Sequence, residues 1–364
     1  MDGSPTAVTI LHPTENRYNT QNLLVRDGAY VDASIYGTGK GGSLTVTAKD
    51  VQVIGTSTDG RFRSGMFTQA YLGITGDGGN LTINTQRLLV RNGAQVDAET
   101  YGTGKGGFLN VTAKDVQLIG TSSNGYFPSG LLTSTHSTGD AGNLKIDTQQ
   151  LLVRDGALIN ASTSGAGKGG SLTVTANDVQ LIGTSSDGRF GSSLLASTDS
   201  TGDAGGLKIS NDNLLVQDGA IVSVSSSGKG IAGNLNIDSA SIRLNNNATV
   251  NANTQAVNTD LSKEQATITL HSEDLLLLRN SNITTNASGE NVIGGNININ
   301  TDILVAFDNS DISANSTDFR GGQVIINAKG VFGTQFRDVP TPNSDITATG
   351  ANQQLNGTVQ LNTL

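Results

Sequence analysis

Apolar side chains along this chain alternate with polar ones in short runs that end at glycine, asparagine, aspartate, serine or threonine. Leu44 and Val46 form one such run, and Leu81 and Ile83 form another. A period of two residues is the pattern of a β-strand with one buried face, whereas an amphipathic helix places apolar residues three or four positions apart. The pattern therefore predicts short strands and turns with almost no helix.

A long segment of this strand-and-turn pattern occurs three times. The first copy, residues 23–62, begins LLVRDGAYVDASIYGTGKGG, and similar copies begin at Leu88 and Leu151, at successive intervals of 65 and 63 residues. Self-similarity at a nearly fixed period indicates a repeat architecture in which each unit packs only against its neighbours.

Each long repeat contains two smaller units, because the pattern G-x-L-x-V/I occurs twice in it. The units begin at Thr6, Gly42, Gly79, Gly107, Gly142, Gly170, Gly205, Gly233, Ala266, Gly295, Gly322 and Gly357. Their lengths are 27 to 37 residues, and units of 28 alternate with units of 35 to 37 in the first part of the chain. This spacing predicts eleven complete coils and the start of a twelfth.

Three strands can be assigned to each coil; in the third coil they are LTIN from Leu81, LLV from Leu88 and AQVDA from Ala94. Alternate residues of each strand face inward and form aliphatic columns along the stacked coils. We predict an all-β, right-handed parallel β-helix of about eleven three-strand coils, the right hand being the usual one for parallel crossovers. It is one β-solenoid over residues 1–364, with regular double repeats of 63–65 residues in 1–232 and less regular coils in 233–364.

Composition and charge narrow the range of functions. The formal net charge of −9 is spread along the chain and opposes binding to nucleic acid. No run approaches the ~18 to 20 apolar residues of a membrane span, and the first residues lack the basic start and apolar core of a signal peptide. The chain has no cysteine, which excludes disulfides and thiolate chemistry.

The motifs LLVRDGA, GTGKGGSLTVTA, DVQLIGTS and STGDAGNLKIDT, over roughly residues 7–330, resemble those of large cyanobacterial exoproteins related to filamentous haemagglutinin. The resemblance implies a right-handed parallel β-helix, two-partner secretion through an outer-membrane pore partner, and an adhesive or structural role. It carries over no site residue. We therefore expect a non-enzymatic rod that is secreted or held at the bacterial outer surface, with a glycan or a cell-surface receptor as its partner.

Several charged residues have the type and spacing of known sites but are better interpreted as turns. The string GTGKGG lacks the Ser or Thr that a phosphate loop needs after its lysine, and GDGG and GDAG lack the frame of calcium-binding nonapeptides. D-G and N-G pairs predict corners with positive φ. The lysines are Lys40, Lys105, Lys168 and Lys229; the aspartates of GDGG and GDAG are Asp77, Asp140 and Asp203; the corners are Asp27, Asn92, Asp155 and Asp218.

The alternative function is that of a carbohydrate-active or carbohydrate-binding β-helix. An enzyme of this kind needs carboxylates at one singular place, and the less regular part offers Asp308, Asp311 and Asp318 near Arg320. The histidines, His12, His136 and His271, fall in different coils, so we interpret them as surface residues and expect no metal site or nucleophile relay. We expect no catalytic residue and no cofactor.

Long coils carry an insertion between their second and third strands. Eleven residues occupy this connection at 55–65, 120–130 and 183–193, compared with five at 91–95. The three insertions should form a row of loops at one corner of the coil. Each phenylalanine either covers apolar strand surface beneath its loop or belongs to a repeated contact surface. The candidate contact residues are Arg61, Phe62, Tyr126, Phe127, Arg189 and Phe190.

Overall fold

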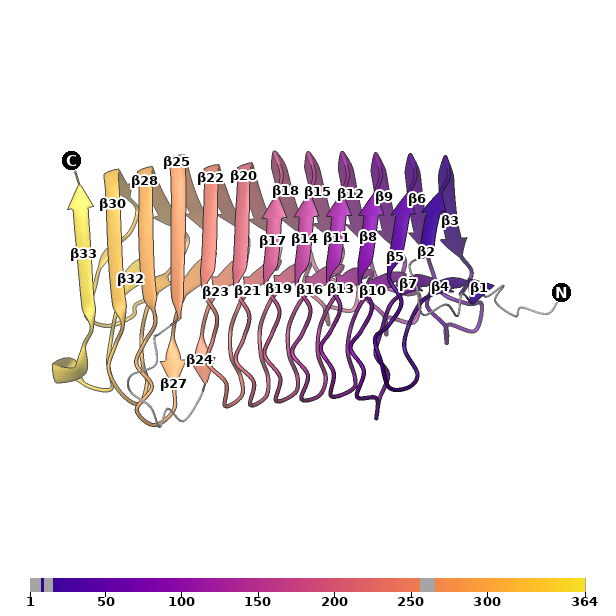
Figure 1. Ribbon diagram of the computed structural model, residues 1–364. Helices are drawn as coiled ribbons and strands as arrows, with labels where there is room; N and C mark the ends of the chain where they lie inside the picture. The colour runs from indigo at the N-terminus through magenta and orange to yellow at the C-terminus, as the bar shows by residue number, and fades with distance from the viewer. Residues whose placement is uncertain (1–7, 10–15, 256–265, 364) are drawn as a thin grey trace.

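The strands of this protein lie side by side in successive coils along one axis (Figure 1). The computed structural model describes residues 8–9, 16–255 and 266–363. Within these ranges every pairing between strands is parallel, and, apart from one short strand near the carboxyl end, each strand pairs with its equivalents in the neighbouring coils. The predicted parallel β-helix is therefore confirmed. One short 3₁₀ helix, η1 (Gln353–Leu355), lies near the carboxyl end of the described chain.

The first six coils have separate first and second strands. The first strands are β2 (Asn16–Asn19), β5 (Leu44–Thr47), β8 (Leu81–Asn84), β11 (Leu109–Thr112), β14 (Leu144–Asp147) and β17 (Leu172–Thr175). The second strands are β3 (Asn22–Arg26), β6 (Asp50–Ile54), β9 (Arg87–Arg91), β12 (Asp115–Ile119), β15 (Gln150–Arg154) and β18 (Asp178–Ile182).

The later coils join these two strands into one. The joined strands are β20 (Leu207–Gln217), β22 (Leu235–Asn245), β25 (Thr267–Arg279), β28 (Asn296–Phe307) and β30 (Gln323–Phe332), followed by β33 (Thr358–Thr363). The change begins at Leu207, before residue 233, where the sequence had suggested that the coils become less regular. Its cause is continuous pairing through the corner, where Asn211 lies opposite Ser239.

The third strands form a sheet of their own. They are β1 (Val8–Thr9), β4 (Tyr30–Asp32), β7 (Gly65–Phe67), β10 (Gln95–Asp97), β13 (Gly130–Leu132), β16 (Leu158–Asn160), β19 (Ser193–Leu195), β21 (Ile221–Ser223), β23 (Thr249–Asn251), β26 (Asn282–Thr284), β29 (Ile312–Ser313) and β32 (Asp345–Thr347). Two further short strands, β24 (Thr254–Gln255) and β27 (Ala287–Ser288), pair with each other, and β31 (Gln335–Phe336) pairs with β32. In the described residues β2 to β32 complete eleven coils, and β33 begins a twelfth.

The predicted start of the first coil was wrong. A coil that began at Thr6 would make Val8 part of a first strand, but Val8 pairs with Val31 in the third-strand sheet. The first coil instead begins at β2, where Asn16 lies opposite Leu44, 28 residues further along. Polar Asn16 occupies the position that leucine fills in the next coils, so the alternation of apolar residues did not reveal this strand.

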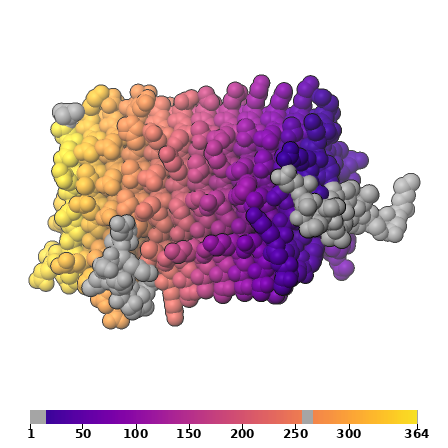
Figure 2. Space-filling view, in the orientation of Figure 1, coloured from indigo at the N-terminus to yellow at the C-terminus, as the bar shows by residue number. Residues whose placement is uncertain are grey.

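The core consists of the predicted aliphatic columns. Leu109 lies between Leu81 and Leu144 in the neighbouring coils, and all three side chains are at most 1% exposed. The columns continue through the described coils, and Figure 2 shows the coils packed against one another without a break along the long axis. Because each coil buries its apolar stripe only against its neighbours, stacking is what stabilises the rod.

The predicted corners after the second strands are confirmed. The backbone φ is +59° at Asp27, +57° at Asn92, +57° at Asp155 and +58° at Asp218. This left-handed conformation is strained for most side chains and tolerated by Asp and Asn, and a glycine follows each of them. These corners turn the chain from the second strand into the third.

Candidate functional site

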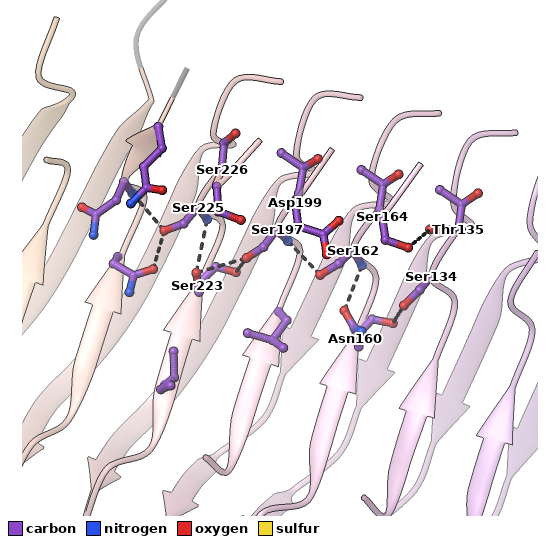
Figure 3. Close-up of a pocket in the computed structure, with 18 of the residues that line it drawn as sticks. Ser134, Thr135, Asn160, Ser162, Ser164, Ser197, Asp199, Ser223, Ser225 and Ser226 are labelled. Carbon is purple, nitrogen blue, oxygen red and sulfur yellow. Dashed lines mark hydrogen bonds between the residues drawn. The ribbon is translucent and has the colours of Figure 1, made fainter. Parts of the chain in front are cut away.

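A groove runs along the rod beside the third-strand sheet. Three residues after the third strand, one residue of each coil forms an isolated parallel β-bridge with the equivalent residue of the next coil. The series runs from the bridge between Ile35 and Ala70 to the bridge between Ser226 and Thr254. Side chains around these bridges line a groove of about 550 Å³ between Ser134 and Gln255. Figure 3 shows that its walls come from successive coils.

Hydroxyl and amide groups form a ladder along this groove. The backbone N–H of Ser197 donates to Ser162 Oγ at 2.9 Å, and that of Asn253 donates to Ser225 Oγ at 2.9 Å. Ser225 Oγ in turn donates to Asn251 Oδ1 at 2.6 Å. Each polar side chain is thus held by the next coil, so the groove wall has a fixed order of donors and acceptors.

Aromatic rings extend the same side of the rod toward the amino end. Tyr36 and Tyr71 are stacked with centroids 4.5 Å apart, and Tyr101 and His136 with centroids 4.6 Å apart. Residue Tyr36 is 57% exposed. All of these rings belong to one column, made of the residues that follow the bridge positions: Tyr36, Tyr71, Tyr101, His136, Ser164, Asp199, Ser227 and Gln255.

Two buried carboxylates lie beside the aromatic rings. Asp97, at the end of β10, accepts a hydrogen bond from the backbone N–H of Glu99 at 2.7 Å. Glu99 accepts one from the Tyr101 hydroxyl at 2.9 Å and one from His136 Nε2 at 3.3 Å. The other ring nitrogen of His136 lies 2.8 Å from Ser164 Oγ. A continuous chain of hydrogen bonds therefore crosses three coils.

The surroundings of these hydrogen-bonded residues shift the pKa values of Asp97, Glu99 and His136. Burial raises the pKa of Asp97 well above its ordinary value, and the nearby charge of Glu99 adds to this. Burial also acts to raise the pKa of Glu99, but the hydrogen bond and charge of His136, together with the hydrogen bond from Tyr101, outweigh it and lower that pKa. The hydrogen bond to Glu99 raises the pKa of His136. The charged form of the His136–Glu99 pair is therefore favoured.

The three predicted loops do lie at one corner of every second coil. They connect β6 to β7, β12 to β13 and β18 to β19. Successive loops contact each other: Asn124 Nδ2 donates to the carbonyl of Gly60 at 3.2 Å, and the Arg189 guanidinium donates to the carbonyl of Gly125. The loops thus form a continuous ridge.

The candidate contact residues on this ridge differ in exposure. Phe62 is 53% exposed and Tyr126 is 67% exposed, whereas Phe127 and Phe190 are half-buried. The Arg189 guanidinium lies over the rings of Tyr126 and Phe190, with centroids 5.5 and 5.8 Å away. Arg63, which the sequence had not singled out, lies over Phe127 at 5.5 Å. Arg61 is exposed. A contact role for these residues stays a prediction.

The residues interpreted as turns have structural roles. Asp77 Oδ1 accepts from the backbone N–H of Lys105 at 2.8 Å, and Asp140 and Asp203 accept in the same way from Lys168 and Ile231. Their carboxylates thus join neighbouring coils. The side chains of the lysine ladder, Lys40, Lys105, Lys168 and Lys229, are exposed.

The carboxylates proposed for a hidden site in the less regular part do not converge on Arg320. Asp308 adopts a corner conformation with a φ of +58°, and Asp318 accepts from the backbone N–H of Gly289 at 2.7 Å. Asp311 accepts from the backbone N–H of Asp345 at 3.0 Å; burial raises its pKa, and the nearby charge of Arg337 opposes this. Asp311 and Asp318 thus each accept from a backbone N–H of a neighbouring coil.

The sequence reasoning missed the aromatic and carboxylate end of the groove. His136 is at the surface, as expected, but its ring is fixed by Tyr101, Glu99 and Ser164. His271 is exposed, and His12 lies outside the described residues. A usable signal was present, because Tyr36 and Tyr101 both directly precede GTGKGG in their repeats.

Comparison with known proteins yields no match to a family model, a curated protein or a solved structure. Among the described residues no helix is long and apolar enough to cross a bilayer. Functional interpretation therefore depends on the groove and the ridge.

Proposed function

We propose that this chain is an adhesive rod displayed at the bacterial outer surface, and that it binds an extended, uncharged polysaccharide along the groove. The observation that carries the proposal is the polar ladder, which repeats once per coil along the axis. A regular polymer presents its hydroxyl groups at a regular spacing, so each coil can contact another part of it. Many weak contacts of this kind add up to a useful affinity.

The aromatic column supports a sugar ligand. Exposed tyrosine rings such as Tyr36 present a flat apolar face with a polar edge, which suits the apolar face and hydroxyl rim of a sugar. Exposed Asp199 places a carboxylate on the groove wall, so an uncharged polymer is favoured over a polyanion. Display at the outer surface, through an outer-membrane pore partner, is proposed from the motif resemblance.

The loop ridge is a second candidate contact surface, because Phe62 and Tyr126 are more than half exposed. Its repetition at every second coil suits a weak, multivalent contact with a cell-surface receptor.

Binding of uncharged and acidic polysaccharides to the purified chain, followed by affinity electrophoresis, tests the proposal. We expect an uncharged polymer to bind, and Tyr36→Ala to weaken binding about fivefold, which corresponds to roughly 1 kcal/mol for one stacking contact. Tyr126→Ala is the matched control, since it removes an exposed tyrosine from the ridge. Absence of binding to every uncharged polymer, or an equal loss in both variants, contradicts the proposal.

A further inference from the structure

A serine, a histidine and a glutamate lie in hydrogen-bonding order where the aromatic column meets the polar groove. Ser164 Oγ is 2.8 Å from His136 Nδ1, and His136 Nε2 is 3.3 Å from Glu99 Oε1. The three residues follow β16, β13 and β10, so they belong to three successive coils. A hydroxyl, a base and a carboxylate that orients the base are the parts of an activated nucleophile, whatever their order in the chain.

The partners of the imidazole determine its reactive form. Ionised Glu99 can only accept a hydrogen bond, so the neutral ring carries its proton on Nε2 and presents the lone pair of Nδ1 to Ser164. Tyr101 restrains both groups, because its hydroxyl donates to Glu99 Oε2 at 2.9 Å and its ring stacks on His136 at an interplanar angle of 12°. The base is therefore held in one orientation by its neighbours.

The reactive atoms face the groove. Ser164 and His136 both line it, and the His136 side chain is 38% exposed, whereas that of Glu99 is 6% exposed. Asn160 lines the same groove; its Oδ1 accepts from the backbone N–H of Ser162 at 3.0 Å, so its amide nitrogen is the donor that it can offer to an oxyanion. Substrate can reach the nucleophile while the orienting carboxylate stays covered.

We propose that Ser164, His136 and Glu99 form an ester-hydrolysing site. Its substrate class is carboxylic esters, and in particular acyl groups carried by a polysaccharide in the groove; this last point rests on the proposed function.

The reaction has two steps. Ser164 Oγ attacks the ester carbonyl carbon while Nδ1 of His136 takes the hydroxyl proton. The bond to the leaving alkoxy oxygen then breaks, and the imidazolium gives that oxygen the proton, so that an alcohol departs and the acyl group remains on Ser164. Water attacks this acyl-serine, His136 takes its proton and returns it to Ser164 Oγ, and a carboxylic acid is released. Ser164 and His136 are the catalytic residues, and Glu99 is a positioning residue.

A fluorophosphonate probe and p-nitrophenyl acetate test the site with the intact chain. We expect the probe to label Ser164, and ester hydrolysis to fall at least about 100-fold in Ser164→Ala and His136→Ala. Ser171→Ala is the matched control, since this exposed serine lies seven residues after Ser164 and does not line the groove, so labelling and rate should be unchanged. Circular dichroism spectra of all variants should agree with that of the unmodified chain.

The role of Glu99 has its own readout. Hydrolysis should increase as the pH rises through the pKa of His136, because only neutral imidazole accepts the proton. Glu99→Gln should slow hydrolysis and move the midpoint of this profile to lower pH, and Glu99→Asp should restore part of the rate. An unlabelled Ser164, or a rate that is the same in Ser164→Ala, overturns the proposal. Labelling of Ser164 without binding of any uncharged polysaccharide instead leaves the esterase site standing and removes the proposed function.

Discussion

Gly107 and Gly142 lie one behind the other in adjacent coils, so closely that a Cβ on Gly142 would overlap the carbonyl oxygen of Gly107. The same relationship holds between Gly79 and Gly107 and between Gly142 and Gly170. These glycines precede the first strands, where the coils must come into register. The glycine of the G-x-L-x-V/I pattern is therefore a packing requirement.

Gly142→Ala should destabilise the rod by a few kcal/mol, because backbone rather than a flexible side chain occupies the space for the new methyl group. Urea unfolding followed by circular dichroism measures the change. Gly37→Ala is the control, since no atom lies within 4 Å of a Cβ at that position and its φ is not positive. Equal stability of the two variants would show that the coils can separate at this corner without cost.

Val111→Asp should destabilise the chain by several kcal/mol, because the side chain is 1% exposed and an unpaired carboxylate would be buried among aliphatic groups. Thr112→Asp, one residue further on the exposed face of the same strand, should change stability by less than about 0.5 kcal/mol. Thermal unfolding compares the two. A similar decrease in both would mean that β11 does not present these faces.

The His136–Glu99 pair should make stability depend on pH. Glu99 has a lowered pKa, so its contribution is present above the ordinary value of 4.5 and is lost as the pH falls through the folded value. His136 has a raised pKa, so its contribution is present below 6.5 and is lost as the pH rises through the folded value. The pair therefore stabilises most between these two ordinary values.

The difference in unfolding free energy between the unmodified chain and His136→Ala should thus be larger near pH 5.5 than near pH 9. Because the His136 side chain is 38% exposed, solvent screening keeps the change below about 1 kcal/mol. Urea unfolding at the two pH values gives the measurement. A difference that grows toward alkaline pH would contradict the assigned direction of the shift.

Shortening the three loops of the ridge to the length of the β9–β10 connection should preserve the fold, since that connection already joins the same two strands in a neighbouring coil. Circular dichroism should remain that of a β-protein. Polysaccharide binding should also remain, because the groove is built from other residues. If binding disappears with the loops, the ridge holding Phe62 and Tyr126 is the contact surface.

Much of the fold follows from the sequence because inward positions such as Leu109 and Val111 repeat at the coil period, and only stacking can bury them. The exceptions occur where a polar or aromatic residue occupies a position that is aliphatic in the other coils. Asn16 and Tyr18 pair with Leu44 and Val46, so the first strand carries no aliphatic alternation. The joining of strands from β20 onward also has no signal, since the inward residues Ile209 and Leu214 are five positions apart across the corner, just as Val174 and Val179 are in the preceding coil, where the two strands are separate.

The site was harder to predict because it depends on which residues follow each bridge. Glu99 and His136 are 37 residues apart, and His136 and Ser164 are 28 apart. Only the actual coil lengths and the shape of the corner bring these side chains within hydrogen-bonding distance. Tyr36 and Tyr101 were visible as repeated residues, but their stacking partners Tyr71 and His136 are not part of the long repeat.

The direction of the hydrogen bonds between coils has a mechanical consequence. Strand pairing in a sheet lies across the strands, so in this rod the backbone hydrogen bonds run parallel to the long axis. A tensile force along this axis loads the interfaces between coils in series, so the weakest interface separates first. Each detached coil of 35 residues releases on the order of 120 Å of chain when extended. Under tension the rod should therefore lengthen in steps, one coil at a time, while the remaining coils stay folded.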